Sequence, residues 1–191
     1  MKQFVFTINE IDTNKCTSKD WNNFVRKREA EMIFSLFPDK KFDLGLELGA
    51  GDGGQSITIS NYCRNLICTE IDEQSHSWLG QKILERDLPN VDYRLCDAHD
   101  LSKFKDRSFD LIFSSNVLEH LYDIDKCLSE CMRVLKDEGV MLHTMPNRIW
   151  KTTNFLLSPL KIRIPRVHGT SSNHLTEFFK FGFRSWKKSL R

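Results

Sequence analysis

Short apolar runs alternate with longer amphipathic stretches through the central part of the chain. The apolar runs have the length of strands, and they occupy residues 43–48, 66–70, 91–95, 109–115 and 139–145. The stretches between them have the apolar spacing of helices at 53–63, at 73–86 and from about Val117 to Lys136. The pattern therefore predicts an α/β fold, with a doubly wound, mostly parallel sheet and helices on both faces.

One further amphipathic helix is predicted before the first strand, over residues 18–37. Ser18 or Asp20 is suited to cap the start of this helix. Pro38, directly after residue 37, ends it. Trp21 and Phe24 fall on its apolar side. We expect both rings to pack the helix onto the sheet, with a place in a substrate pocket as the alternative.

Glycines and acids follow the first three predicted strands. The segment ELGAGDGG comes after the first strand and contains G-x-G-x-x-G, formed by Gly49, Gly51 and Gly54. Glu70 follows the second strand, 21 residues beyond Gly49, where nucleotide-binding folds place the acid that binds the ribose hydroxyls. Asp97 follows the third strand. Because ligands of doubly wound sheets bind at the carboxyl ends of the strands, these segments predict a nucleotide-like site.

Negative charge distinguishes this site from an ordinary dinucleotide site. Glu47 precedes the glycine turn, Asp52 lies within it, and Glu70 and Asp97 end the next two strands. A pyrophosphate prefers an electropositive pocket and would be repelled by these carboxylates. S-adenosylmethionine contains ribose and adenine, has no phosphate, and carries a cationic ammonium and a cationic sulfonium. The residues therefore favour this molecule, with the glycines allowing close approach of the backbone.

Four segments together carry a family resemblance. LELGAGDGG, CTEID, CDAHDL and FDLIFSSNVLEHL, the last continued by CLSECMRVLKDEGVMLHTMPN, occur in this order over residues 43–147. In order and spacing they resemble the class I, Rossmann-like, S-adenosylmethionine-dependent methyltransferases, particularly the small-molecule branch called type 11. The resemblance implies S-adenosylmethionine as cofactor and S-adenosylhomocysteine as product. It implies a cofactor site built from Glu47, Gly49, Gly51, Glu70, Ile71, Asp97, Ala98 and Asn116.

For the methionine end and the ribose, the resemblance implies contacts from Glu47, from the backbone at Gly49 and from Glu70. Asn116 would line the inner side of the cofactor. Glu47 has a structural alternative, as an acid at the end of a strand that caps the next turn. Asp52 is equally well explained as a turn residue, because aspartate is common in turns. For Glu70, the position in the fold and the resemblance agree.

For the adenine, the resemblance implies that Asp97 accepts a hydrogen bond from the amino group, with Ala98 beside it. Ile71 would pack on the face of the adenine ring. The structural alternative for Asp97 is a cap on a short loop. Asp72 and Asp100 are expected to be solvated neighbours of the site and not ligands.

Methyl transfer from a sulfonium is an in-line displacement, in which the protein mainly aligns the nucleophile and excludes water. A base is needed only for a hydroxyl, a phenol or an acidic carbon. His120, just past the fourth strand, is the best-placed candidate for a catalytic base. The alternative, which we favour, is that it fixes its loop by hydrogen bonding. His168, His174 and Tyr122 are weaker candidates for the acceptor side.

None of the cysteines forms a C-x-x-C pair. We expect them to pack the core in a reducing compartment, and we expect no metal site. The first residues lack a secretory apolar segment, and the cytoplasm is therefore the expected location. The six cysteines are Cys16, Cys63, Cys68, Cys96, Cys127 and Cys131.

Charge is unevenly placed along the chain, although the net charge is only +2. Residues 151–191 hold nine Lys/Arg and one acid, a net +8, whereas residues 1–150 hold 19 Lys/Arg and 25 acids, a net −6. We therefore expect a cofactor-binding domain over residues 1–150. We expect residues 151–191 to form a basic, aromatic extension that packs on this domain or forms a substrate lid. Lys161, Arg163 and Arg166 would then favour an anionic acceptor.

Several partners are compatible with these features. A small-molecule acceptor is expected, and nucleic acid is not favoured, because no recognised nucleic-acid motif is present. The apolar stretch FLLSPL beside basic residues would allow contact with a membrane surface. No convincing strand pair follows residue 147, so the last two strands of the family fold are expected to be missing. An exposed edge of this kind invites pairing with a second copy of the chain.

Two other functions fit parts of the sequence. One is a catalytically incomplete domain that binds S-adenosylmethionine or a protein partner. The other, less favoured, is an NAD-dependent oxidoreductase built on the same glycine turn. In an oxidoreductase Asp97 and the segment LEH have no role, and the negative charge of Asp52 counts against a dinucleotide.

Overall fold

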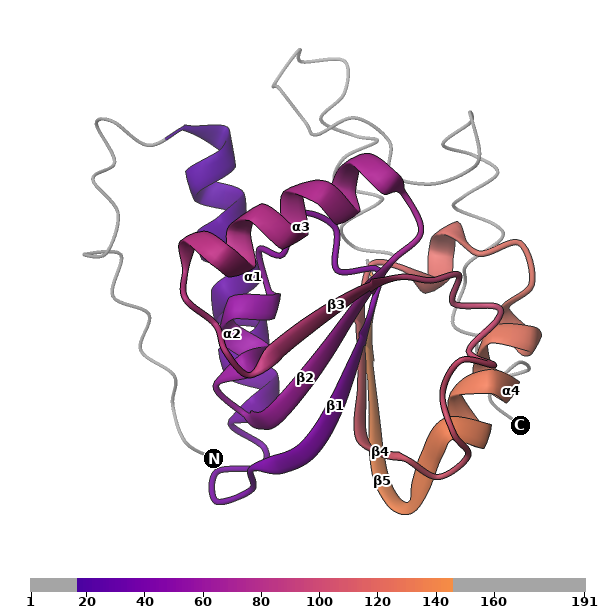
Figure 1. Ribbon diagram of the computed structural model, residues 1–191. Coiled ribbons are helices and arrows are strands. Elements are labelled where there is room, and N and C mark those ends of the chain that lie inside the picture. The colour runs from indigo at the N-terminus through magenta and orange to yellow at the C-terminus, as the bar shows by residue number, and fades with distance from the viewer. Residues whose placement is uncertain (1–16, 146–191) are drawn as a thin grey trace, which may run out of the picture.

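The computed structural model of the protein describes residues 17–145. Its five strands are all parallel and lie in the order β3-β2-β1-β4-β5 (Figure 1), which confirms the predicted doubly wound α/β fold. The strands are β1 (Phe42–Leu48), β2 (Cys63–Glu70), β3 (Val91–Leu95), β4 (Phe109–Ser115) and β5 (Leu135–Thr144). The helices are α1 (Ser18–Phe34), α2 (Ser56–Ser60), α3 (Glu73–Glu85), the 3-10 helix η2 (Leu118–His120) and α4 (Ile124–Val134).

The two faces of the sheet are covered by different helices. Figure 1 shows α1, α2 and α3 on one face and α4 on the other, as the sequence pattern predicted. Side chains of a strand alternate between the two faces. On β4, Leu111 and Phe113 therefore belong to the core under α1–α3, and Ile112 belongs to the core under α4. Both cores are buried, which explains why the central strands are apolar on both sides.

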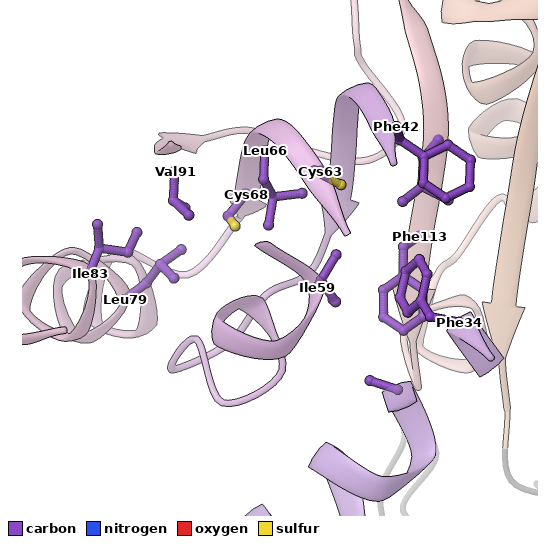
Figure 2. Packing of buried hydrophobic residues seen from close by; sticks show 12 residues of the cluster. Phe34, Phe42, Ile59, Cys63, Leu66, Cys68, Leu79, Ile83, Val91 and Phe113 are labelled. Atoms are coloured by element: carbon purple, nitrogen blue, oxygen red, sulfur yellow. The ribbon is translucent and has the colours of Figure 1, made fainter. Parts of the chain in front are cut away.

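The core under α1–α3 has an aromatic centre. The Phe34 ring stacks on Tyr62 at a centroid distance of 4.4 Å and lies 5.9 Å from Phe113. Figure 2 shows Phe34 beside Phe113, with the apolar side chains of β2 and α3 continuing the same layer. Burying each such side chain stabilises the fold by about 1.5–3 kcal/mol. This layer fixes α1 on the sheet through its C-terminal half.

The N-terminal half of α1 differs from the prediction. Its N-cap is Thr17, whose side chain forms a capping box with Asp20, and the helix ends at Phe34, three residues before the predicted end. Trp21 stacks on Phe24 at 5.8 Å but remains 48% exposed. The expectation that the Trp21 ring packs α1 onto the sheet is therefore wrong, and the fully buried residues of this helix, Ala30 and Phe34, lie in its C-terminal half.

The predicted helix from about Val117 to Lys136 is interrupted. Asn116 has a left-handed backbone, with φ 53°, and the 3-10 helix η2 follows it. A new helix, α4, then begins where the Asp123 side chain accepts the Lys126 N–H at 3.0 Å. The predicted helix over 53–63 is likewise shorter, because Cys63 already pairs with β1 as the first residue of β2.

The last strand, β5, also starts earlier than predicted. Leu135 pairs with Phe109, and after an irregularity the regular register resumes with Val140 opposite Leu111. The predicted strand over 139–145 corresponds to this regular part. Three predictions concern residues outside the described range. They are the absence of two further strands, the pairing of two copies through the exposed sheet edge, and the extension over residues 151–191.

The cysteines that the structure describes are free and buried. Cys127 and Cys131 share the inner face of α4, and both are fully buried. Their role in core packing is confirmed for these residues, whereas Cys16 lies outside them. Within residues 17–145, no helix has the length and apolar character that a membrane span requires.

Candidate cofactor site

The site is expected where the strand order reverses. β2 and β3 lie on one side of β1, and β4 and β5 lie on the other. The connections leave the carboxyl ends of β1 and β4 in opposite directions, and it is at this point that doubly wound sheets bind their ligands. The segments that follow these strands therefore determine what the protein binds.

The glycine turn after β1 has three left-handed residues: Gly49 with φ 62°, Gly51 with φ 57° and Gly53 with φ 76°. The third is Gly53 and not Gly54, which the G-x-G-x-x-G pattern indicated. A side chain at Gly49 would lie 2.5 Å from Val117, whereas a Cβ at Gly51 would meet no atom of residues 17–145 within 4 Å. Gly49 is therefore needed for packing. Gly51 faces open space in which a ligand can approach the backbone.

Glu70 holds the glycine turn against the end of β2. Its Oε2 accepts the Gly51 N–H at 2.8 Å, and its Oε1 accepts the N–H groups of Ile71 at 2.8 Å and Asp72 at 3.1 Å. The residue is only 9% exposed, whereas the neighbouring Ile71 side chain is 63% exposed. Glu70 therefore sets the shape of the turn. Its Oε1 already accepts two N–H groups, whereas its Oε2 accepts one and retains a lone pair for a further donor.

Glu47 points beneath the turn. Its Oε2 accepts the Ser56 hydroxyl at 2.6 Å and the Cys68 thiol at 3.2 Å, and the residue is 2% exposed. Burial raises the pKa of Glu47 to about 7, an effect that the two donors partly offset and the charge of Glu70 increases. Ser56 is the first residue of α2, so Glu47 joins the end of β1 to the start of the next helix. This agrees with the structural alternative, in which Glu47 caps the turn that follows the strand.

Asp97 lies after β3 and is engaged on one side only. Its Oδ1 accepts the His99 backbone N–H at 2.9 Å and contacts His99 Nδ1 at 2.6 Å. Burial alone would raise the pKa of Asp97, but the bonds from His99 outweigh it and hold the pKa below its ordinary value. The carboxylate stays ionised, and within residues 17–145 its Oδ2 has no hydrogen-bond donor. The adjacent Ala98 is 9% exposed.

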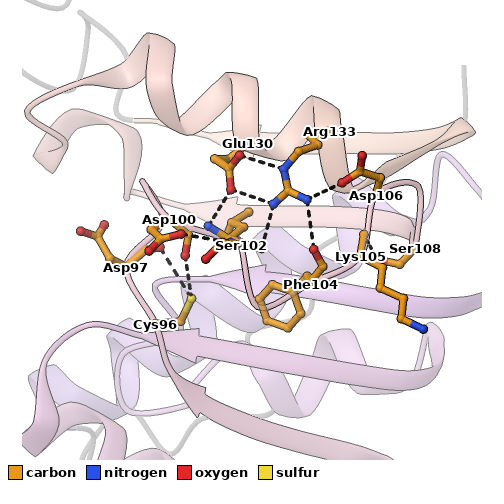
Figure 3. Close-up of polar contacts among 11 residues, drawn as sticks. Cys96, Asp97, Asp100, Ser102, Phe104, Lys105, Asp106, Ser108, Glu130 and Arg133 are labelled. Atoms are coloured by element: carbon orange, nitrogen blue, oxygen red, sulfur yellow. Dashed lines mark hydrogen bonds and ion pairs between the residues drawn. The ribbon is translucent and has the colours of Figure 1, made fainter.

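The segment that carries Asp97 is anchored to α4 by Arg133. The guanidinium bonds the carbonyl oxygens of Leu101 and Phe104 and the carboxylates of Asp106 and Glu130, over 2.6–3.0 Å. Figure 3 shows this cluster, with the Asp97 carboxylate pointing away from it. Sequence reasoning missed Arg133, because its partners lie about thirty residues away in the chain, except for Glu130.

The acids that the sequence treated as neighbours have structural partners. Asp52 forms an ion pair with Lys82 at 3.0 Å and accepts the Gly54 N–H, in agreement with its interpretation as a turn residue. Asp72 caps α3 by accepting the Ser75 N–H at 2.7 Å. Asp100 accepts the Ser102 N–H at 3.1 Å. These contacts account for all three without a ligand.

The carboxyl end of β4 meets α1 through Arg26. This guanidinium donates to Glu29 at 2.8 Å and to the Ser115 hydroxyl at 3.3 Å. With the Asn116 amide in the orientation that satisfies both groups, the Asn116 oxygen also accepts from Arg26. Sequence reasoning missed Arg26, although a cation on the amphipathic helix before β1 was visible in the sequence.

Two histidines lie at the ends of neighbouring strands. His120 is half-buried at the end of η2, directly after β4 as expected from the sequence. His143, on β5, was not singled out from the sequence. Its Nδ1 lies 2.6 Å from the Ser114 hydroxyl, and its Nε2 is buried without a hydrogen bond to residues 17–145. Burial lowers the pKa of His143 to about 4, so the ring is neutral.

Other candidates do not join this site or cannot be placed. Tyr122 is 77% exposed and stacks on His99. His168, His174 and the basic residues 161, 163 and 166 lie outside the described residues. Over residues 17–145, no three His, Cys, Asp or Glu side chains form a group that could bind a metal ion.

The fold and the row of strand-end residues define a nucleoside-binding α/β protein of the doubly wound class. A profile of the methyltransferase family Methyltransf_11, described as "Methyltransferase domain", matches residues 46–143. The chain belongs to this methyltransferase family. The matched range contains the glycine turn, Glu70, Asp97 and Asn116.

Individual relatives agree with this assignment. A protein named as a probable S-adenosylmethionine-dependent methyltransferase from Mycolicibacterium smegmatis is 35% identical over 104 residues, 54% of this chain and 38% of that protein. Demethylmenaquinone methyltransferase from Thermotoga maritima is 33% identical over 150 residues, 77% of this chain and 62% of that protein. The structure of YcgJ from Bacillus subtilis superposes with a TM-score of 0.56 at 25% identity, covering 60% of this chain and 50% of that one.

This chain thus spans 38% and 62% of the lengths of the two sequence relatives. S-adenosylmethionine is the cofactor of the family, and the site fits it. The open space over Gly51 leaves room for a ligand beside the backbone. The ionised Asp97 offers Oδ2 to a donor, and the acids Glu47, Asp52 and Glu70 on the neighbouring strand ends would repel a phosphate. The family assignment therefore favours S-adenosylmethionine over NAD.

Proposed function

We propose that the protein transfers the sulfonium methyl group of S-adenosylmethionine to a small acceptor that carries an anionic group. The observation that carries the proposal is the arrangement of three adjacent strand ends, on β1, β2 and β3. They present an open glycine turn, a buried acid that shapes this turn, and a carboxylate with one free oxygen. When bound, the cofactor supplies an already activated methyl group.

In this proposal the adenosine lies along the ends of β2 and β3. Glu70 accepts a ribose hydroxyl at Oε2, with the lone pair that its three backbone donors leave. Asp97 Oδ2 accepts from the adenine amino group, with Ala98 beside it, and the exposed Ile71 side chain packs on the ring. Hydrogen bonds to charged groups of this kind contribute about 1.5–3 kcal/mol each.

The methionine end lies over the glycine turn. The backbone at Gly49 and Gly51 approaches it closely, and Asn116 lines its inner side. Because Glu47 is held by Ser56 and Cys68, we assign it a supporting role beneath the turn, where its charge attracts the ammonium group. This attraction is strengthened by the low dielectric of the buried position.

The acceptor side is assigned to the end of β4 and to α1. Arg26 places a positive charge beside Ser115 and Asn116, which supports an anionic acceptor. The residues of the protein align the nucleophile with the methyl group and exclude water. Where the nucleophile is a hydroxyl or phenol, His120 is the candidate base for its proton. Replacing it with alanine should then lower kcat, with little effect on cofactor affinity and a smaller loss at high pH. An unchanged kcat in His120→Ala would leave it the structural role favoured above.

The test is a methyl-transfer screen with S-adenosylmethionine carrying a labelled methyl group, over matched neutral and anionic acceptors. The wild type is compared with a variant reversed at Lys161, Arg163 and Arg166. Lys105→Glu, an exposed reversal at the amino end of β4, is the control. We expect anionic acceptors to be preferred by the wild type and the control, and the preference to fall in the triple variant.

Equal turnover of neutral and anionic acceptors would overturn the proposal that the acceptor carries an anionic group. Equal preference in the wild type and the triple variant would remove residues 161–166 from the acceptor site. Tight cofactor binding with no turnover on any acceptor would instead support the alternative, a cofactor-binding domain without catalysis.

A further inference from the structure

His99 is a buried polar residue that the proposed cofactor contacts do not include. It is 3% exposed and lies between the end of β3 and the loop before α4. Its ring Nδ1 contacts Asp97 Oδ1 at 2.6 Å, and its Nε2 accepts the Asp123 N–H at 3.4 Å. The ring also stacks on Tyr122 with a centroid distance of 3.9 Å and an interplanar angle of 20°. Both ring nitrogens and one face of the His99 ring are therefore held by neighbouring residues.

The two nitrogen partners determine the tautomer of His99. A backbone N–H can only donate, so Nε2 facing Asp123 is an acceptor and carries no proton. The ring proton is then on Nδ1, where it is donated to the Asp97 carboxylate. The choice of tautomer by the partner of the second nitrogen is a common way of fixing the direction of a histidine hydrogen bond.

This bond has a consequence for Asp97. The backbone and the ring of His99 both donate to Oδ1, so the carboxylate cannot rotate without losing two hydrogen bonds. Oδ2 has no donor among residues 17–145 and is left at a fixed position. Lys126, on α4, is the nearby cation that influences the same carboxylate, but it forms no hydrogen bond with it. The orientation of Oδ2 therefore depends mainly on His99.

We propose that His99 is a positioning residue, which holds the Asp97 carboxylate so that Oδ2 selects a purine with a 6-amino group. The inference rests on the proposed role of Asp97 as the acceptor for adenine. A 6-oxo purine would place a carbonyl oxygen against Oδ2, and two acceptors facing each other cannot form a bond. A fixed oxygen rejects this analogue strongly, whereas a carboxylate free to rotate can turn away.

A matched pair of substitutions separates positioning from simple burial. In His99→Asn the side-chain N–H lies close to the position of Nδ1 and can still donate to Asp97. In His99→Gln the amide lies closer to the position of Nε2, and the bond to Asp97 is lost. Both variants replace the ring by a neutral amide, so loss of the Tyr122 stack is common to them. Asp97→Asn is the reference for losing the carboxylate itself.

The experiment measures, by calorimetry, the affinities for S-adenosylhomocysteine and for its analogue with hypoxanthine in place of adenine. We expect the wild type to prefer adenine. The ratio of affinities should fall about tenfold in His99→Gln, the effect of one well-aligned hydrogen bond, and by less than about threefold in His99→Asn. The ionisation of Asp97, followed by carbon NMR without any ligand, should shift to higher pH in His99→Gln and much less in His99→Asn.

The outcomes distinguish the two levels of the argument. No binding of S-adenosylhomocysteine by the wild type would overturn the proposed function. Binding that Asp97→Asn leaves unchanged would overturn the adenine role of Asp97, and the inference on His99 with it. If Asp97→Asn loses the preference but both His99 variants keep it, His99 is only a structural residue. An equal loss in His99→Gln and His99→Asn, with thermal unfolding unchanged, would also contradict positioning through Nδ1.

Discussion

The two halves of the carboxyl edge are built differently. On the β1–β3 half, backbone N–H groups of the glycine turn and of the β2 end converge on one buried acid, Glu70. On the β4–β5 half, side-chain contacts join separate elements, with Arg26 linking α1 to Ser115 and Asn116. Backbone contacts are set by short sequence motifs, and side-chain contacts across elements can change with each substitution. The comparison predicts that substitutions on the cofactor half act through the backbone of the turn, whereas those on the acceptor half act through single side chains.

The largest effect is expected from Gly49→Ala. Its Cβ would lie 2.5 Å from Val117, on a backbone with φ 62°. The left-handed conformation costs about 1–2 kcal/mol for a residue other than glycine, and the overlap adds roughly 1–3 kcal/mol. We expect the free energy of unfolding, measured with denaturant, to fall by the sum of these terms.

Gly51→Ala is the control, because the same left-handed strain occurs with free space for the methyl group. It should cost only the strain, about 1–2 kcal/mol. S-adenosylhomocysteine should nevertheless bind about tenfold more weakly, because the new methyl group enters the space assigned to the cofactor. Wild-type affinity in Gly51→Ala would move the cofactor away from this part of the turn.

Glu70→Ala should have the next largest effect, on cofactor binding. The substitution removes the ribose acceptor and the acceptor of three backbone N–H groups. We expect a loss of about 1.5–3 kcal/mol in the affinity for S-adenosylhomocysteine, measured by calorimetry. Ser115→Ala, on the other half of the edge, should leave this affinity within about twofold, or about 0.4 kcal/mol. Similar losses in both variants would erase the distinction between the halves.

The sequence predicted the cofactor half well, because its features are local. The strands, the turn and Glu70 follow from periodicity and from a fixed spacing along the chain. The helix over 117–136 was predicted wrongly, because apolar residues keep helical spacing across a break. The break depends on the left-handed Asn116 and on the Asp123 cap, which periodicity does not reveal.

Contacts across the fold were also beyond the sequence. The bond from Arg26 to Ser115 joins residues 89 positions apart, so no local pattern indicates it. The burial of Glu47 under α2, and with it the raised pKa, requires the packed structure. Trp21 shows a different error. Its apolar position on the helix predicted burial, but the side chain remains exposed.

Glu47 should give a stability effect that depends on pH. The pKa of its carboxyl rises from 4.5 to about 7 on folding, because burial penalises the charged form. Folding is therefore favoured by the neutral Glu47 carboxyl. This contribution to stability is fully present below about pH 4.5 and is lost as the pH rises through about 7. At pH 8, Glu47→Gln should be more stable than the wild type by roughly 2–3 kcal/mol, with little difference at pH 4.

Thermal or denaturant unfolding at the two pH values measures this difference. Glu85→Gln, an exposed substitution on α3, should show no such pH dependence. If Glu47→Gln and the wild type keep the same relative stability from pH 4 to pH 8, Glu47 is not titrating in this range.

The smallest effect is expected on the acceptor half, from Arg26→Gln. The ion pair of Arg26 with Glu29 is partly exposed, at 39% and 28%, so its loss should change stability by less than about 1 kcal/mol. Cofactor affinity should stay within about twofold of the wild type, because Arg26 contacts the cofactor site through Asn116 and not through Glu70 or Asp97. The KM for an anionic acceptor should instead rise about threefold to tenfold, with the KM of its neutral counterpart unchanged.

Arg64→Gln is the matched control for Arg26. Arg64 also forms a surface ion pair, with Asp43 at 3.1 Å, but at the amino end of β2, away from the site. Steady-state kinetics with the acceptor pair found in the methyl-transfer screen would compare the two variants. A KM that rises equally for both acceptors would mean that Arg26 acts by holding α1 over the site. A KM that rises only for the anion would mean that its charge binds the acceptor, and the two halves of the edge would then bind separate substrates.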